Sequence, residues 1–571
     1  MNPGNLNSKI KKMKKNTKIL SLIFLVATFP SLAQEQPVKQ EVKVVKAYEP
    51  VINDAFKISE LPKINDTLKI STSFQYEILP VQHKTSFVPV PIKPARLVSE
   101  PLSKHYYGYA KAGFGSYLSP LFQVYAGSNR SENWNWNTYF NYNSTNGKVK
   151  NEANEKVYAG LSDLSVSADG SRFLKNSKVL NGSASYQNLI NYYYGYNPES
   201  VAENNIQAPL LKDSIENQVI NLFNANLGIS TNYIDSSHVN YQIDANWQTL
   251  SAKDGIDENY MKIKTRFNYF FEKEFIGADI DLIYIANHGL QDTTNAAIFK
   301  FSPWVGAFGN KWRIVAGVNT FFDQANEEYH FYPKISMHYN IIEYFLIPYL
   351  EFDGSFQENS YADIYKMNPF VRQTLSVKPL DTKINLTFGF RGNISSKVAF
   401  NIKVNYAEIS NQYFFVTDTT TELQNKLETV TDNISRFRFL GELSYKTNEK
   451  LWLSLKANYY EYQMESQLKP WHMPNYNLSF NVRYKLQQKI ILDANLFGIG
   501  TRYAREFDQN SLLVAKELPG IIDLNLGVEY RFSKRLSAFV NFNNISAVKY
   551  YQWNNYPTQQ FNLMAGATYS F

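Results

Sequence analysis

Apolar and polar side chains alternate residue by residue through most of the chain beyond its first hundred residues. The stretch NWNWNTYFNYN puts Trp134, Trp136, Phe140 and Tyr142 on one face of an extended chain and asparagines on the other. Because successive side chains of a strand point to opposite faces, this pattern predicts strands with one apolar and one amide-rich side. A soluble β-sandwich would bury the aromatic side, whereas an outer-membrane barrel would turn it towards lipid and enclose the amides.

The same alternation recurs in IIDLNLGVEYRF, residues 521–532, and in NYNLSFNVRYK, residues 475–485. Segments of this kind have about the 9–11 residues that a tilted strand needs to cross the hydrocarbon layer. Two kinds of connection join them: short polar turns at 309–311, 448–450, 487–489 and 533–535, and long connections at 197–217, 416–431 and 505–520. Short turns at one end and long loops at the other favour a barrel, because a sandwich has no reason to separate them.

Because short turns and long loops must alternate along the chain, the order of the connections gives a strand count. Strands counted forward from Tyr106 and backward from Phe571 agree when residues 358–381 form one long external loop. This yields about 22 strands, an even number, as a single-chain antiparallel barrel requires. A barrel of this width normally has a plugged lumen. The sequence therefore predicts an all-β fold, a transmembrane antiparallel β-barrel of about 22 strands over residues 105–571.

The composition agrees with a barrel and argues against a helical membrane protein. Aromatic residues make up 15% of the 571 residues and charged residues 19%, and the mean hydropathy is −0.37. Helical spans are apolar all round, whereas a barrel strand needs apolar side chains only at alternate positions. The chain has no cysteine, so it folds without disulfides and cannot be anchored through an acylated N-terminal cysteine.

Residues 1–33 have the organisation of a cleaved signal peptide. Six lysines precede an apolar run that contains Pro30, and a small-x-small motif places cleavage between Ala33 and Gln34. A membrane-anchoring helix is the alternative, although the apolar run is short and is broken by the proline. Removal of the six lysines lowers the formal net charge from +7 to about +1. The basicity therefore belongs to the signal, and it indicates no nucleic-acid partner.

Residues 34–104 contain eight prolines and differ from the rest of the chain. Each proline removes a hydrogen-bond donor from a strand, so a stretch such as VPVPIKPARLVSEP cannot lie inside a sheet. We expect an extended, Pro-rich segment on the periplasmic side of the barrel or threading its lumen. It is a candidate for a reduced plug or for a partner-binding arm.

The C-terminal sequence carries four short motifs in a fixed order: Asn541 to Asn544, Lys549-Tyr550-Tyr551, Tyr556-Pro557 and Tyr569-Ser570-Phe571. In this order they resemble the closing strands of TonB-dependent receptors. The stretch that starts at Asn368, NPFVRQTLSVKP, resembles the N-P…K-P-E loop of the same family, with Leu380-Asp381 where glutamate is usual. The resemblance covers the barrel and implies an outer-membrane receptor. The Asn- and Tyr-rich composition is also similar to Bacteroidota outer-membrane proteins, which implies a Gram-negative cell.

The last strand carries a further implication of this resemblance. Its apolar face, made by Phe561, Leu563, Tyr569 and Phe571, resembles the terminal signal that the barrel-assembly machinery reads by strand pairing. The simpler interpretation is that these side chains form only the lipid face of the last strand. Both can hold together.

The N-terminal segment departs from the family in length, because the family's transporters carry a globular plug larger than the 71 residues present here. Within EVKVVKAYEPVINDAFKI, Val42, Val44, Val45, Ala47 and Tyr48 resemble the family's box for coupling to TonB. A free β-prone segment can add itself to the sheet edge of a partner. TonB or another envelope protein is therefore an expected partner of residues 34–104.

The sequence gives no support for an enzyme. It contains no G-x-S-x-G, Walker A or H-E-x-x-H motif, and its seven histidines are dispersed. His330 and His338 share a predicted strand face but lie about 26 Å apart at 3.3 Å per residue, which excludes one metal ion between them on that strand. We expect no catalytic residue, no metal site and no cofactor.

Three functions remain open from the sequence. The first is a TonB-dependent-receptor-like transporter that carries a bulky solute across the outer membrane. The second is a scaffold subunit of an outer-membrane protein complex, which would hold a partner through residues 34–104. The third is an open, diffusive porin.

Overall fold

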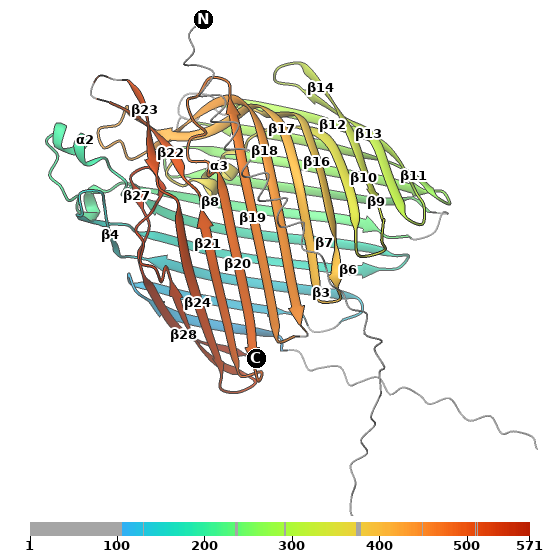
Figure 1. Cartoon of the computed structure of the whole chain (residues 1–571), viewed down its shortest axis with the longest axis horizontal. Coiled ribbons are helices and arrows are strands. Elements are labelled where there is room, and N and C mark those ends of the chain that lie inside the picture. Colours follow the sequence, from blue (N-terminus) through green and yellow to red (C-terminus); the bar gives the residue numbers. More distant parts are fainter. Residues whose placement is uncertain are drawn as a thin grey trace, which may run out of the picture. The chain divides into compact units, whose positions relative to one another are not determined.

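The computed structural model shows that the C-terminal part of the chain forms one closed antiparallel barrel (Figure 1). The structure describes residues 106–571 except 129–130, 234–237, 290–292, 373–377, 448, 509 and 511. The predicted signal peptide at 1–33, with the predicted cleavage site between Ala33 and Gln34, and the Pro-rich segment at 34–104 lie outside the described residues.

Twenty-two strands form the ring, which confirms the predicted fold class and strand count. The first eleven are β1 (Gly108–Gly115), β2 (Ser119–Gly127), β3 (Trp134–Thr145), β6 (Leu161–Leu174), β7 (Lys178–Tyr192), β8 (Asn217–Thr231), β9 (Asn240–Ala252), β10 (Asp257–Phe270), β11 (Glu274–His288), β12 (Thr293–Phe308) and β13 (Trp312–Asp323). The other eleven are β14 (Glu328–Tyr339), β15 (Ile347–Gln357), β16 (Leu380–Ser395), β17 (Val398–Thr417), β18 (Leu427–Thr447), β19 (Leu451–Met464), β20 (Tyr476–Leu486), β21 (Ile490–Ile499), β24 (Ile521–Arg531), β25 (Leu536–Asn543) and β28 (Asn562–Ser570).

Smaller elements lie in the connections between these strands. They are β4 (Lys148–Lys150), β5 (Lys156–Tyr158), α2 (Pro198–Glu203), the 3-10 helix η1 (Lys212–Ser214), α3 (Tyr361–Met367), β22 (Arg502–Phe507), β23 (Leu513–Leu518), β26 (Tyr551–Trp553) and β27 (Tyr556–Pro557). Within the described part of the chain, no helix has the length and apolar character needed to span a membrane.

Pairing between the first and last strands closes the ring. β1 runs antiparallel to β28, with Ala112 opposite Ala567. The backbone N–H groups of Tyr107 and Gly108 donate to the carbonyl oxygen of Phe571 at 2.8 and 3.3 Å. Every strand of the ring therefore has a partner on both sides, and no sheet edge is left with unpaired N–H and C=O groups.

Where a strand has an amide-rich side, that side lines the lumen. Asn143 of β3 and Asn525 of β24 line one common cavity, which only inward-facing side chains can share. Trp134 and Trp136, on the other face of β3, are exposed on the outside of the barrel. The orientation is that of an outer-membrane barrel and the reverse of a soluble sandwich.

The connections differ between the two ends of the barrel, which we call the turn end and the loop end. The four short turns predicted from the sequence all lie at the turn end: 309–311, 448–450, 487–489 and 533–535. At the loop end, residues 358–379 form a single connection that includes α3, in agreement with the strand count.

Two predicted long connections contain more regular structure than expected. β17 continues to Thr417 and β18 begins at Leu427, so their connection covers 418–426 instead of 416–431. Residues 505–520 are not an open loop, because β22 and β23 form an antiparallel hairpin there. Both corrections add structure at the loop end.

The two faces of one strand predict unequal losses of stability from an added charge. Ile263 is exposed on the outer face near the middle of β10, and Asn268 lies on its inner face. Ile263→Lys should lower the free energy of unfolding in lipid vesicles by about 2–4 kcal/mol, because the charge would face hydrocarbon near the bilayer midplane. Asn268→Lys should lower it by less than about 1 kcal/mol, since the lumen is polar. Urea unfolding of the vesicle-embedded protein measures both, and equal losses would contradict the assignment of faces.

Candidate functional site

The connections at the loop end pack against one another and against the inner wall. We call the described residues within 358–372, 411–433, 465–475, 500–520 and 544–561 the loop lid. One buried apolar cluster joins side chains of the lid to the inner faces of β8 and β9. These strands lie far around the ring from β16, β17 and β25, so contacts between the two groups cross the lumen. The loop lid therefore covers the lumen at the loop end.

The inner wall changes character where α3 meets it. Four inward positions of β8 and β9 near the loop end are apolar and buried: Ile220, Leu222, Leu250 and Ala252. Ile364 and Tyr365 of α3 belong to the same cluster. Burial of such a side chain contributes roughly 1.5–3 kcal/mol, so this patch holds α3 over the lumen.

Hydrogen bonds fix the beginning of α3. The Oγ of Ser360 accepts from the N–H of Asp363 at 3.1 Å, as an N-cap does. The N–H groups of Tyr361 and Ala362 donate to the carboxylate of Glu258 at 2.7 and 3.3 Å. Since Glu258 lies at the start of β10, the lid is bonded directly to the wall, and N–H groups that have no partner within the helix are satisfied.

β17 and β18 supply the middle of the lid. They have 20 and 21 residues, about twice the 9–11 that cross a bilayer. Their register shifts beside Asn411, whose φ of 57° is in the left-handed region, and a bulge of this kind bends a strand. Beyond it, Tyr413 and Phe415 face the cluster that contains α3, while Phe414 packs with Trp471. Because both faces of β17 beyond Asn411 are buried, the direction in which this part of the strand runs is fixed.

An aromatic stack forms the centre of the lid. Tyr556 of β27 stacks on Phe370 with ring centroids 3.8 Å apart, and Tyr194 packs edge-on against Tyr556 at 5.0 Å. The hydroxyl of Tyr556 donates to the carbonyl of Asn425, and that of Tyr194 to the carbonyl of Pro557 at 3.0 Å. The stack thus joins three parts of the lid to the connection between β7 and β8.

A group of three buried residues, Arg502, His472 and Asn554, holds the β26–β27 hairpin from another side, and we call it the latch. The guanidinium of Arg502 donates to the carbonyl oxygens of Tyr551 and Gln552 at 2.7 and 2.9 Å. These two bonds fix the backbone of the hairpin without using its side chains.

The histidine of the latch must be neutral. The backbone N–H of Asn554 donates to Nε2 of His472 at 3.1 Å, so Nε2 carries no proton. Nδ1 therefore carries it and donates to the carbonyl of Phe415 at 2.9 Å. Burial lowers the pKa of His472 to about 4, and the positive charge of Arg502 acts in the same direction.

Ion pairs connect further parts of the lid. Arg372 contacts Asp418 at 3.1 Å and Glu428 at 3.2 Å, and Arg505 contacts Glu428 at 2.8 Å. Because both arginines and Glu428 are partly exposed, each pair contributes at most about 1 kcal/mol. The pairs mainly set how three connections lie against one another.

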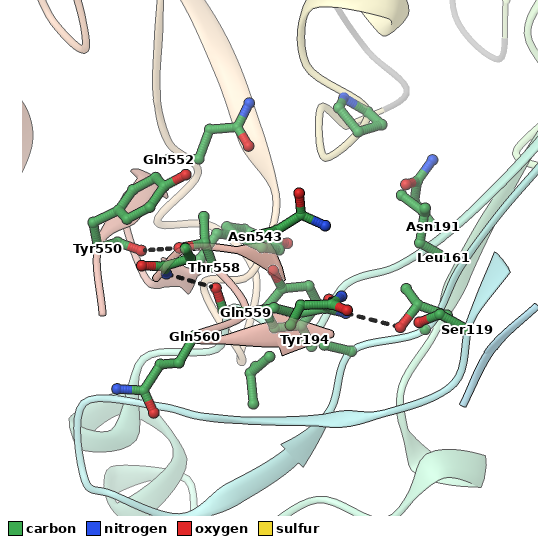
Figure 2. Close-up of a pocket in the computed structure, with 18 of the residues that line it drawn as sticks. Ser119, Leu161, Asn191, Tyr194, Asn543, Tyr550, Gln552, Thr558, Gln559 and Gln560 are labelled. Carbon is green, nitrogen blue, oxygen red and sulfur yellow. Dashed lines mark hydrogen bonds between the residues drawn. The ribbon is translucent and has the colours of Figure 1, made fainter. Parts of the chain in front are cut away.

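Beneath the lid lies a cavity of about 590 Å³, which we call the chamber. Nine of its 28 lining residues are asparagine or glutamine, six are aromatic, and two, Lys366 and Asp523, are charged. Figure 2 shows Asn191, from β7, on the opposite side of this space from Tyr550 and Gln552, which belong to the lid. The volume falls within the roughly 300–1,000 Å³ of small-molecule sites, so the chamber is the candidate ligand site.

The sequence-predicted site residues lie away from the chamber. Phe561, Leu563, Tyr569 and Phe571 are exposed on the outer face of the barrel, and their role as an assembly signal stays a prediction. The coupling-like residues Val42, Val44, Val45, Ala47 and Tyr48 lie outside the described residues. Among the residues that the structure describes, no group of three His, Asp or Glu side chains is placed to hold a metal ion.

Sequence reasoning missed the lid and the chamber, although two signals were present. Apolar residues at inward positions such as Ile220 and Leu250 break the amide pattern, and the apolar stretch around Phe414 and Phe415 continues past the length of a spanning strand. The latch gives no local signal, because its three residues are far apart in the sequence.

Comparisons with known proteins identify the fold. No protein-family model and no curated protein matches the sequence. The siderophore receptor PirA from Acinetobacter baumannii matches with a TM-score of 0.64 at 11% identity, over 83% of this chain and 81% of that one. The FrpB iron transporter from Neisseria meningitidis matches with a TM-score of 0.62 at 11% identity, over 82% of each chain. The chain thus shares the barrel fold of these two proteins.

The latch predicts that acid weakens the contribution of His472 to closure of the lid. An exposed histidine titrates near pH 6.5, whereas the pKa of His472 in the closed lid is about 4. Between these values His472 binds more protons in the open lid, so its contribution to closure is fully present above pH 6.5 and is lost as the pH falls towards 4. Burial raises the pKa of Glu358, another residue of the lid, to about 7, so Glu358 acts in the opposite direction. The contribution of His472, measured as the difference between the unaltered protein and His472→Gln, should lower the protection of the 551–556 amides against hydrogen exchange roughly tenfold or more between pH 7 and pH 5, after correction for intrinsic rates.

Two variants distinguish a pH dependence caused by His472 from one caused by the neighbouring carboxylate of Glu506. His472→Gln should remove most of this pH dependence, since the amide does not titrate in this range. Glu506→Gln should keep it, although the carboxylate of Glu506 accepts a hydrogen bond from Asn554 at 3.0 Å. The same change in protection from pH 7 to pH 5 in the unaltered protein and in His472→Gln would contradict the neutral latch.

Proposed function

We propose that this chain is a TonB-dependent-receptor-like transporter that moves a bulky solute across the outer membrane of a Gram-negative, Bacteroidota-type cell. The barrel fold shared with receptors and transporters such as PirA and FrpB supports this proposal. The apolar outer surface supports insertion into lipid. The observation that carries the proposal is the lid that the chain's own connections form across the lumen, with the chamber beneath it. A lumen covered by such a lid suits a carrier that admits its solute only when the lid moves.

In this proposal the signal peptide is cleaved between Ala33 and Gln34 after export. The barrel-assembly machinery then recognises the last strand, whose outward face ends in Tyr569 and Phe571. Residues 34–104 act as a reduced plug, and their Val44-Val45 segment couples the barrel to TonB by strand addition.

A scaffold subunit of an outer-membrane complex is the second candidate. It is favoured by exposed apolar residues on the hairpin of β22 and β23: Phe507, Leu512, Leu513 and Val514. Such a patch at the loop end could seat another envelope protein. An open porin is not proposed, because the lid crosses the lumen. Neither is an enzyme, since the similar structures are described as receptors and transporters.

Conductance in planar bilayers tests the closed lid. In protein that lacks residues 34–104, the intact lid alone should keep conductance low. Phe370→Ala combined with Tyr556→Ala in that background should open large channels, because each truncation removes roughly 3–5 kcal/mol of packing. Phe507→Ala, which truncates an exposed aromatic ring of the lid, is the matched control and should leave the barrel closed. Large constitutive channels with the lid intact would favour the porin.

Native co-purification separates transport from scaffolding. Val44→Pro combined with Val45→Pro removes two backbone donors and should abolish recovery of TonB with the protein. Lys43→Ala combined with Lys46→Ala keeps those donors and should preserve it. Recovery of a stable, stoichiometric set of other envelope proteins without TonB would favour the scaffold and contradict TonB coupling.

A further inference from the structure

Six hairpin turns at the turn end finish with a basic residue. Each is the last residue before the strand that follows, and its side chain is exposed. None of the six side chains forms a hydrogen bond or an ion pair with another residue that the structure describes. Two acidic residues, Glu272 and Glu449, lie in the same turns but pair with none of them. We call the six the basic collar: Lys273, Lys311, Lys397, Lys450, Lys489 and Arg535.

The basic collar borders the lumen. The carbonyl oxygen of Arg535 accepts a hydrogen bond from the N–H of Ser570 in β28 at 2.7 Å, so the hydrogen-bonded ladder continues into the turn. Leu536, the next residue, is exposed on the outer face of the barrel. Because successive side chains of a strand alternate, that of Arg535 lies on the luminal side. The carbonyl oxygens of the other five collar residues accept an N–H from the next hairpin along the chain in the same way.

Three collar residues lie directly opposite a second basic residue. In each pair the N–H of the second residue donates to the carbonyl oxygen of the first at 2.7 or 2.8 Å: Lys397 with Lys446, Lys450 with Lys485, and Lys489 with Arg531. Like charges directly opposite each other destabilise a sheet. Among the described residues, Arg531 alone of these six contacts a carboxylate, that of Glu529 at 3.7 Å. An anion bound at the mouth of the lumen would relieve this repulsion.

The chain's own N-terminal segment does not have the charge to neutralise the collar. Residues 34–104 contain ten Lys or Arg and eight Asp or Glu, a net charge of +2. Lipid headgroups surround the outside of an inserted barrel, whereas the collar lies on its luminal side. Short turns of bacterial outer-membrane barrels face the periplasm. The counter-charge therefore belongs to a separate molecule in the periplasm.

The spacing of the collar suits an extended chain better than a compact anion. Lys397, Lys450, Lys489 and Arg535 precede every second strand of the continuous series from β17 to β25. Neighbouring strands lie about 4.8 Å apart, so these four residues follow one another at about 10 Å and cover about 30 Å. A phosphate ion could reach one of them at a time. An extended polypeptide rises about 3.3 Å per residue and covers the same arc with roughly nine residues.

We propose that the basic collar docks a periplasmic partner protein through an extended, acidic segment of that partner. The carboxylates of the segment pair with the collar, relieve the repulsion between its opposed cations and hold the partner at the mouth of the barrel. This inference goes beyond the proposed function, because it requires neither a transported solute nor coupling to TonB.

Fluorescence anisotropy of a labelled poly-glutamate peptide of about twelve residues tests the docking on the mature full chain in a non-ionic detergent. The net charge of the mature chain is only about +1, so a polyanion is attracted by the local field of the collar and not by the protein as a whole. The peptide should bind saturably, and more weakly as salt is raised from about 0.05 M to about 0.5 M. Poly-glutamine of the same length should not bind.

Matched variants locate the binding at the collar. Lys450→Glu combined with Lys489→Glu should weaken peptide binding about tenfold or more, because like charges across an interface repel. Lys212→Glu combined with Lys253→Glu changes the net charge equally at exposed lysines of the loop end and should leave the affinity unchanged.

Neutral variants separate docking from a structural role of the collar. Lys450→Gln combined with Lys489→Gln should weaken peptide binding without lowering the midpoint of urea unfolding in vesicles, because it removes repulsion between like charges. This pair also keeps the test valid if the charge-reversed variant fails to fold.

Several results would overturn the docking site. They are absence of saturable poly-glutamate binding, equal weakening in the collar and loop-end variants, and unchanged affinity in both collar variants. Displacement of the peptide by inorganic phosphate at the same molar concentration would make the collar a site for small anions. Displacement by phosphatidylglycerol added to the micelles would assign the collar to lipid headgroups. Either displacement would also overturn the proposal.

Discussion

The closed ring of hydrogen-bonded strands is the constraint on which the rest of the structure depends. Inside a bilayer, every backbone N–H and C=O must be paired within the protein, and pairing of β1 with β28 removes the last free edge. Each strand then has one face towards lipid and one towards the lumen. The alternation of apolar and polar residues therefore decides which side chains each face presents. Outward positions such as Ile263 and Phe388 are apolar, whereas inward positions such as Asn143 and Asn525 carry amides.

The lid follows from a local change in that alternation. Near the loop end the inner wall of β8 and β9 becomes apolar, so Ile220 and Leu250 require an apolar cover, which α3 and the ends of β17 and β18 provide. The chamber is the space left between the amide wall and this cover. Phe370 and Tyr556 belong to both, because their stacked rings hold the lid closed and also line the chamber.

Local periodicity was sufficient to predict the barrel but not the site. The alternation around Trp134 and the turn at 533–535 depend on residues close in sequence, so strand faces, turn ends and the strand count could be predicted. The site depends on contacts between distant segments, such as the one between Asn554 and His472. No periodic pattern encodes such a contact, and the bend at Asn411 that directs β17 over the lumen depends on a single residue in the left-handed region.

Two tryptophans test the central claim, that apolar faces meet lipid and amide faces enclose water. Trp247 and Trp452 are 42% and 41% exposed, but Trp247 packs on Phe223 on the outer face, and Trp452 lines an inner cavity beside Asn481. The measurement is fluorescence of single-tryptophan variants in vesicles with brominated acyl chains. Strong quenching of Trp247 and little quenching of Trp452 is the predicted result. Equal quenching of the two, or stronger quenching of Trp452, would contradict it.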